Sequence, residues 1–413
     1  MRAILQNINF RRMWIAATVL SFGDAVMQMG LLEFFRQHGY DVQTETARLL
    51  FAVSLPGVFF GLVAMAYLDR WQRRSVLMMS DAWRAVTVVI IVMWLLPVVQ
   101  GRLESRGFMV VYTMIFVNGA ITIFYYPARY AMVPNLIESE HLIRANTLLT
   151  SSVAVANVAG RGIGGFVAER MGVEWAIMSN ALAYLISFGL VWCIHMKPHA
   201  TTGGAAAHPE GGWGEMKVGL VYLWEHKTAM PLVALAGALA FMGAVFVVVF
   251  VGYSMTTLGL SAGGLGYLFV ALGIGGAVGM IIVTHARRLA RSAWLPFFQL
   301  LIGGAVLVLM SQVTNPWLAA LMLAVLASVG APLMILLDAR LQEAVGDQRR
   351  GAVFAARGML TSITMVVAFW LQFGTEFFRR TPAPVVMMWL GWGSMAAALL
   401  TVGMFLARRR QAQ

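Results

Sequence analysis

The sequence predicts an all-α membrane protein with 12 transmembrane helices in two six-helix halves and both termini on the cytoplasmic side. The first observation is composition. Of the 413 residues, 60% are hydrophobic and only 12% are charged, against roughly 45–50% and about 25% in soluble domains. The second is a series of long apolar runs, and the third is the placement of basic residues between them. Most of the chain must therefore face lipid or other apolar helices.

The apolar runs define the expected elements. A helix needs about 20 mostly apolar residues to cross the hydrocarbon layer of a bilayer. The runs in this chain are continuous, whereas a membrane β-barrel shows alternating segments of about 10 residues. The expected spans are 13–35, 47–68, 75–98, 107–126, 148–167, 173–194, 231–253, 263–284, 293–313, 316–337, 352–373 and 385–407.

The longest polar stretch, Lys197–Gly212, separates the first six expected spans from the last six. Its Thr-Thr-Gly-Gly-Ala-Ala-Ala composition is typical of a flexible linker. The residues that follow, Trp213–Lys227, place apolar side chains at helical spacing, which predicts an amphipathic helix on the inner membrane face. We therefore expect an N-terminal half over 1–195, a cytoplasmic linker over 196–229 and a C-terminal half over 230–413.

The basic residues orient the chain. With the N-terminus inside, 20 of the 30 Lys and Arg residues fall on the inner side and 7 on the outer side, while Arg84, Arg161 and Arg357 lie within spans. Cytoplasmic loops carry the excess of basic residues, so both termini are expected in the cytoplasm. The net charge of +12 thus reflects membrane topology, and no nucleic-acid partner is expected.

The loop between the second and third spans, Leu68–Arg74, reads L-D-R-W-Q-R-R. It resembles the D-R-x-x-R-R part of the loop signature of the major facilitator superfamily, with Met65 at the position of the usual glycine. An aspartate at a helix end beside arginines can hold two helices together and then release them, as a gate requires. A plain positive-inside loop is the alternative. The candidate residues for a cytoplasmic gate and its brace are Asp69, Arg70, Arg73, Arg74, Asp81 and Arg84.

Further motifs resemble the enterobactin-exporter and macrolide-efflux branch of that superfamily. They are Phe10–Trp14, Gly23-Asp24, Tyr126–Leu136, Arg144–Asn146, Gly164-Gly165, Gly219–Trp224 and Arg349–Val353. The resemblance covers essentially the whole chain and implies the major facilitator fold. It also implies proton-coupled export of a small amphipathic molecule, siderophore or drug-like, by alternating access across a bacterial cytoplasmic (inner) membrane. The chain departs from the branch at Gly160–Gly165, where a proline is usual. Many proton-coupled exporters carry an arginine in the fourth span, whereas here that span offers only Asn118 as a strongly polar interior residue.

Charged side chains within spans are the candidates for the mechanism, because each costs at least ~2.5–3.5 kcal/mol at the membrane centre. With a helix rise of about 1.5 Å per residue, Asp24 lies about 18 Å from Arg12, and Arg84 lies about 15 Å from Arg74. These matching depths allow an ion pair between Asp24 and Arg84. We take Asp24 as the leading candidate for proton coupling, with a static ion pair to Arg84 or Arg161 as the alternative.

Two further charges match more loosely in depth. Glu33 lies about 32 Å from the cytoplasmic edge, and Arg161 lies about 26 Å from Arg144. We predict that Glu33 or Asp24 forms an ion pair with Arg161 in at least one conformational state, since an isolated buried charge is costly. Released from that pair, Arg161 could bind an anionic group of the substrate. The proton-coupling candidates are Asp24 and Glu33, and the candidates for the substrate cavity are Gln28, Asn118, Asn157, Arg161 and Arg357.

A lipid or lysophospholipid flippase on the same fold is the alternative function. An enzyme is not expected, because the chain contains neither H-E-x-x-H nor a P-loop motif. The single cysteine, Cys193, excludes a disulfide framework or a four-thiolate zinc site made by this chain alone, and no cofactor or metal is expected. The expected partners are a small-molecule substrate, protons or another coupling ion, and membrane lipids, and we expect a monomer.

Overall fold

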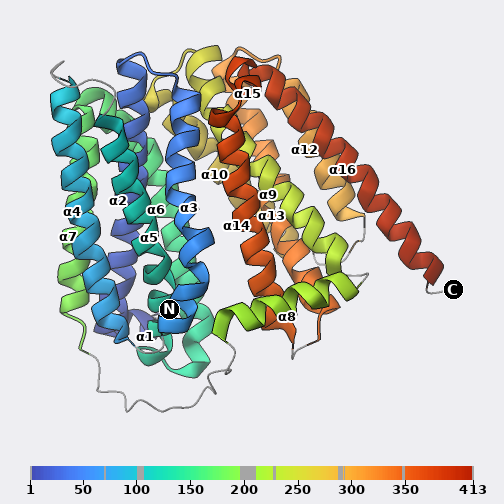
Figure 1. Cartoon of the computed structure of the whole chain (residues 1–413), viewed down its shortest axis with the longest axis horizontal. Helices are drawn as coiled ribbons and strands as arrows, with labels where there is room; N and C mark the ends of the chain where they lie inside the picture. Colours follow the sequence, from blue (N-terminus) through green and yellow to red (C-terminus); the bar gives the residue numbers. More distant parts are fainter. Residues whose placement is uncertain are drawn as a thin grey trace. The chain divides into compact units, whose positions relative to one another are not determined.

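The computed structural model describes residues 2–68, 71–99, 107–195, 211–226, 229–286, 292, 294–346 and 349–411, and all regular structure in them is helical (Figure 1). The helices from the N-terminus to the expected linker are α1 (Arg2–Gln6), α2 (Ile8–Gln37), α3 (Val42–Leu68), α4 (Arg73–Val99), α5 (Gly107–Met132), η1 (Val133–Asn135), η2 (Ser139–His141), α6 (Leu142–Arg170) and α7 (Val173–Trp192). The remaining helices are α8 (Gly211–Glu225), α9 (Ala229–Gly252), η3 (Tyr253–Thr257), α10 (Ala262–His285), α12 (Leu295–Met310), α13 (Pro316–Ala344), α14 (Arg350–Gly374), α15 (Glu376–Arg380) and α16 (Ala383–Gln411).

Each range expected to span the membrane lies mostly within one helix, from the 16 residues of α12 to the 30 residues of α2. Within the described residues, eight helices are long and apolar enough to cross a membrane, which supports a multi-pass membrane protein. They are Ile8–Gln37, Arg73–Leu95, Phe108–Asn135, Val173–Trp192, Ala229–Thr257, Ala262–His285, Pro316–Ala344 and Arg350–Gly374. The number of 12 spans and the side of the termini stay predictions.

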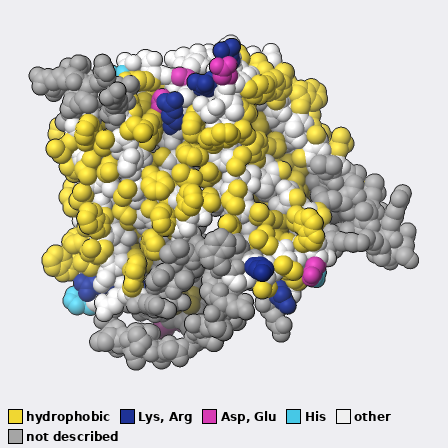
Figure 2. Space-filling view, viewed as in Figure 1, with side chains coloured by type: hydrophobic (Ala, Val, Ile, Leu, Met, Phe, Trp, Pro, Cys, Tyr) yellow, Lys and Arg dark blue, Asp and Glu magenta, His cyan; other side chains and the backbone are white. Residues whose placement is uncertain are grey.

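The chain forms two compact units. The first comprises Met1–Tyr40, Arg48–Trp213 and Ser261–Gly266, and the second comprises Asp41–Ala47, Gly214–Leu260 and Tyr267–Gln413. On the visible face of each unit, hydrophobic side chains cover the middle of the helices, while charged side chains lie near the helix ends (Figure 2). This distribution is typical of helices surrounded by hydrocarbon along their middle.

In the first unit, α2 packs mainly against α6 and α7, and α4 packs against α5 and α7. Glycines on α6 permit the first of these contacts. A Cβ atom on Gly160 would lie 2.6 Å from the carbonyl oxygen of Phe22, and one on Gly164 would lie 2.6 Å from Cα of Val26. The glycine run of the fifth expected span therefore brings α6 against the backbone of α2, as small residues do between membrane helices.

In the second unit, α12 packs against α16 and α13, and α9 packs against α14, α16 and α13. The helix α8 occupies the region expected to be amphipathic, and it runs crosswise beside α14 (Figure 1). A Cβ atom on Gly219 of α8 would lie 2.1 Å from the carbonyl oxygen of Ala352. On the same helix Leu223 is buried and Trp224 is 83% exposed, so α8 has one packed face and one free face.

Candidate functional site

A polar network fills the interior of the first unit around Asp24, in the middle of α2. Nη2 of Arg84, on α4, lies 3.1 Å from Oδ2 of Asp24. Two groups of α7 donate to Oδ1: the amide of Asn180 at 3.2 Å and the hydroxyl of Tyr184 at 2.5 Å. The Arg84 side chain is 4% exposed and that of Asp24 is 32% exposed. Asp24 and Arg84, which were matched by depth, thus form an ion pair in which the arginine is buried and the carboxylate is partly exposed.

The guanidinium of Arg84 is held from several sides. Its Nε donates to Oδ1 of Asn118, on α5, at 3.3 Å. Its Cζ lies 4.3 Å from the ring centroid of Tyr184 and 5.5 Å from that of Tyr125. A desolvated cation gains most from such aromatic faces. A buried pair also needs its remaining donors satisfied, so these contacts fix Arg84 in one position.

A glycine beside the aspartate brings α7 close enough to join the network. A Cβ atom on Gly23 would lie 2.6 Å from Cβ of Ala183 and 2.8 Å from Oδ1 of Asn180. Any larger residue at position 23 would push α7 away from the carboxylate of Asp24. Gly23 therefore allows α7 to pack closely against α2, and the next residue, Asp24, provides the charge that α7 binds.

Asp81 lies one turn before Arg84 on α4. It is fully buried, and its Oδ2 accepts a hydrogen bond from the hydroxyl of Ser187 at 2.6 Å. Its Oδ1 has no hydrogen-bond partner among the described residues. We expected Asp81 and Arg84 to brace the loop that carries Asp69. Both lie in the interior, where Asp81 contacts Ser187 of α7 and Arg84 binds Asp24. The brace stays a prediction, because Asp69 lies outside the described residues.

Two of the other predicted gate residues, Arg73 and Arg74, lie at the start of α4. Asp69 and Arg70 are outside the described residues. Arg73 donates to the carbonyl of Ala131 at 2.6 Å, at the end of α5, and Arg74 donates to the carbonyl of Trp192 at 2.5 Å, at the end of α7. These two arginines therefore tie the start of α4 to its neighbours through backbone carbonyls, which suits a helix C-terminus.

Arg161 and Glu33 do not meet in this structure. Nη2 and Nε of Arg161 lie 3.2 and 3.3 Å from Oε1 of Gln28. The buried carboxylate of Glu33 binds Arg36 at 2.5 and 2.9 Å, Gln37 at 2.9 Å and the backbone N–H of Ala262 at 3.1 Å. Depth matching ignored Arg36, three residues along the same helix, which reaches Glu33 locally. The predicted pair with Arg161 stays a prediction for another conformational state.

The remaining candidates are more scattered. Arg357, on α14, forms an ion pair of 2.5 Å with Asp338, on α13. Asn157 is partly buried on α6 and Gln28 is partly buried on α2. The sequence analysis missed Asp338, because it lies near the end of an expected span, where charges are ordinary.

Sequence reasoning also missed the contribution of α7. Asn180, Tyr184 and Ser187 are spaced at i, i+4 and i+7, so they share one face of an otherwise apolar helix. That spacing was available in the sequence. Uncharged polar groups cost far less in a membrane than charges do, so this spacing is a weaker signal than a charge within a span.

The comparisons with known proteins agree with this architecture. Residues 13–369 match the profile of the Major Facilitator Superfamily. The uncharacterized MFS-type transporter YkuC of Bacillus subtilis is 25% identical over 237 residues, which are 56% of this chain and 53% of YkuC. The lysophospholipid transporter LplT of Photorhabdus laumondii is 24% identical over 295 residues, which are 67% of this chain and 69% of LplT. The chain thus spans about half the length of YkuC. Membership of the enterobactin-exporter and macrolide-efflux branch stays a prediction.

Solved structures share the fold. A bacterial homologue of the iron transporter ferroportin in an inward-facing state has a TM-score of 0.72 at 13% identity, covering 97% of this chain and 98% of that one. The nucleoside transporter NupG has a TM-score of 0.70 at 10% identity, covering 95% of this chain and 100% of that one. At such identities the likeness concerns the fold alone.

Proposed function

Because the chain belongs to the Major Facilitator Superfamily and is a transporter rather than an enzyme, we propose that it exports a small amphipathic molecule, siderophore or drug-like, in exchange for protons. Transport follows alternating access across a bacterial cytoplasmic (inner) membrane. The proposed topology has 12 spans in halves 1–195 and 230–413, with both termini and the linker 196–229 in the cytoplasm. The transporter works as a monomer.

The observation that carries the coupling is the unequal burial of the Asp24–Arg84 pair. A proton can reach the acid, which is partly exposed, while the arginine is enclosed. Protonation of Asp24 removes its charge and so weakens its attraction to Arg84. Arg84 stays in place through Asn118 and the aromatic rings, so the change falls on α2 relative to α4 and α7. In this proposal, protonation of Asp24 thus allows α2 to move.

Arg161 and Gln28 are the proposed polar contacts for the cargo. They come from α6 and α2 and already touch one another, and Arg161 could exchange the neutral amide oxygen for an anionic group of the cargo. Such an exchange gives a charge-assisted and bidentate contact in place of a neutral one. Asn157, Asn118 and Arg357 stay candidates for contact with the cargo.

Transport into inverted membrane vesicles tests the proposal. Acidification of the vesicle lumen should drive uptake of a cargo identified by thermal-shift screening of siderophores, antibiotics and lysolipids. Asp24→Asn should abolish the gradient-driven part, because the amide cannot bind and release a proton. Glu376→Gln is the matched control, because Glu376 is an exposed acid paired with Arg380 at a helix end. Uptake that follows the gradient equally in wild type and Asp24→Asn would reject Asp24 as the coupling group.

Lysophospholipid flipping is the second candidate, favoured by the similarity to LplT. In that case Arg161 would bind the phosphate of the lipid. The two functions differ in their response to a protonophore. Lysolipid movement between leaflets should continue when the proton gradient is removed, whereas proton-coupled export should stop.

A further inference from the structure

A cavity of about 300 Å³ lies inside the second unit, between α9, α10, α12, α13 and α16. Its lining is almost entirely apolar, and none of the described residues that line it carries a charge. Among its lining residues, Gln299, Leu300 and Ser394 are buried, and we call them its floor, while Gly243, Gly330 and Ala331 are exposed and mark its mouth. The cavity is therefore an apolar pocket with small residues, rather than bulky side chains, at its entrance.

One polar group of this lining, the side-chain oxygen of Gln299, stands out among the described residues. Gln299, on α12, is 5% exposed, and its Oε1 has no hydrogen-bond partner among the described residues. The neighbouring hydroxyl of Ser394 already donates to the carbonyl of Leu300 at 2.8 Å. Buried acceptors are seldom left unsatisfied. Since the terminal torsion of a glutamine is broad, the amide of Gln299 can turn its oxygen toward a donor in the cavity.

The corresponding place in the first unit is occupied. There, the first, third, fourth and sixth long helices (α2, α4, α5 and α7) meet around the Asp24 network. In the C-terminal helices the same order gives α9, α12, α13 and α16, and these surround the cavity together with α10. The N-terminal helices thus surround hydrogen-bonded polar groups, whereas the C-terminal helices surround a cavity that contains the amide of Gln299.

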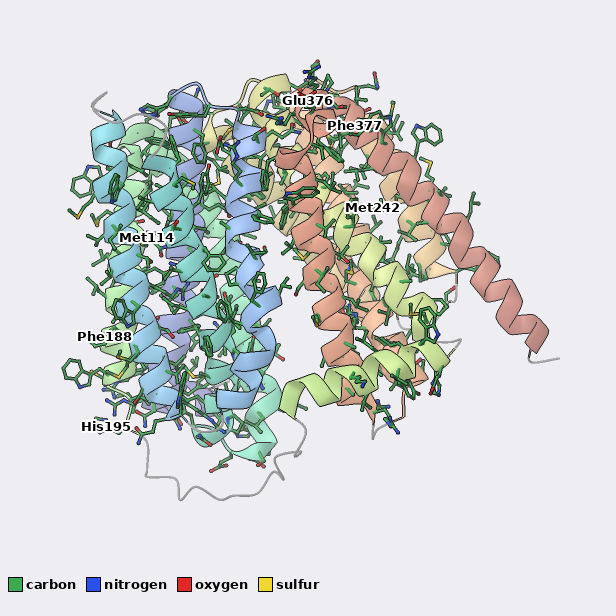
Figure 3. All side chains as sticks on the ribbon, viewed as in Figure 1. Met114, Phe188, His195, Met242, Glu376 and Phe377 are labelled. Atoms are coloured by element: carbon green, nitrogen blue, oxygen red, sulfur yellow. The ribbon has the colours of Figure 1, made fainter. Side chains whose placement is uncertain are left out.

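We propose that this pocket binds an apolar, ring-sized group that carries a single uncharged hydrogen-bond donor, such as a hydroxyl or an aromatic amine. Its volume is about twice the ~150 Å³ of an apolar cavity that binds benzene, so it has room for fused rings. Met242, on α9 (Figure 3), Met334 and Phe246 line it, and methionines adapt to ligands of varied shape. A charged group is excluded because the lining offers no counter-charge.

The assignment of this group to the cargo rests on the proposed function, whereas binding itself does not. In that assignment, the apolar part of an amphipathic cargo enters between Gly243 and Gly330 and its donor meets Gln299. The pocket then selects cargo by the position of one donor on an apolar body. A molecule of the same shape without the donor leaves Gln299 unsatisfied and binds more weakly.

Binding of 1-aminoanthracene to the purified full chain in lipid nanodiscs tests the proposal, with anthracene as the probe that lacks the donor. Empty nanodiscs give the fluorescence background. We expect saturable binding of 1-aminoanthracene, about tenfold tighter than that of anthracene, since one hydrogen bond to a buried acceptor distinguishes them. Gln299→Leu should bind both probes with equal affinity, because the acceptor is gone.

A second variant keeps the test independent of Gln299. A Cβ atom on Gly330 meets nothing within 4 Å, so Gly330→Leu should fold and should fill the mouth, weakening binding of both probes at least tenfold. Gly189→Leu, on α7, is the matched control, because Gly189 is also exposed and unobstructed and lies outside the pocket. Equal affinity for the two probes in the wild type, or unchanged binding in Gly330→Leu, would overturn the proposal. If both probes bind as expected but no proton-driven transport is found, the proposed function is rejected and the pocket proposal is supported.

Discussion

Arg84 shows how a single buried charge determines its surroundings. Four described residues on three helices hold it: Asp24 by charge, Asn118 by an amide oxygen, and Tyr184 and Tyr125 by their rings. No one of these contacts would offset the cost of placing a guanidinium in the membrane interior. Together they do so because the low dielectric strengthens each polar interaction.

The first prediction concerns this pair. Arg84→Met should lower the free energy of unfolding by about 3–5 kcal/mol, because it leaves the Asp24 carboxylate without its cation. The double variant Asp24→Asn/Arg84→Met should recover most of that loss. Thermal or denaturant unfolding of the purified variants measures both. Arg380→Ala is the control, since that arginine pairs with Glu376 at an exposed site, where an ion pair contributes about 0–1 kcal/mol. Equal losses in the single and double variants would show that Arg84 acts through packing alone.

The sequence indicated that Asp24 and Arg84 could pair, but it did not predict the neutral side chains that bind them. A rise of about 1.5 Å per residue sufficed to match Asp24 with Arg84, because both are expensive in a membrane and must meet at one depth. The same reasoning paired Glu33 with Arg161 and missed Arg36, because depth alone ignores a competitor on the same helix. Asn180 and Tyr184, which complete the Asp24 site, carry no charge and gave no comparable signal.

At the scale of elements, glycines determine how closely helices approach. Gly160 and Gly164 bring α6 onto α2, and Gly23 brings α7 onto α2 beside Asp24. The positions of the helices were predictable from the apolar runs, because 20-residue stretches of apolar side chains exclude other structures. Which glycines lie at a crossing was not predictable, because this depends on how far each helix is rotated about its axis.

The second prediction tests one crossing. Gly160→Ala places a methyl group against the backbone of α2 and should cost about 1–3 kcal/mol of stability, as overpacking does. Gly189→Ala should be neutral or stabilising by up to about 1 kcal/mol, because alanine is the better helix former and the site is open. Both are measured as shifts in unfolding of the purified protein. A Gly160→Ala variant as stable as Gly189→Ala would show that α6 and α2 can separate without cost.

At the scale of the whole molecule, topology can be tested with the native cysteine. Cys193 is exposed at the end of α7, on the side predicted to be cytoplasmic. A membrane-impermeant maleimide should therefore label it in inverted vesicles and not in intact cells. The reverse should hold for Cys193→Ser/Arg380→Cys, in which the new thiol lies between the last two expected spans. Labelling of Cys193 from outside intact cells would reverse the predicted orientation.

The contrast between the two bundle interiors has a mechanical consequence. Close packing makes a protein interior stiff, and applied pressure favours states in which internal voids disappear. A bundle centred on bonded polar atoms therefore resists compression, whereas one centred on an empty apolar volume yields to it. We therefore expect the C-terminal helices to yield around this cavity, so tighter lateral packing of the surrounding bilayer should reduce its volume.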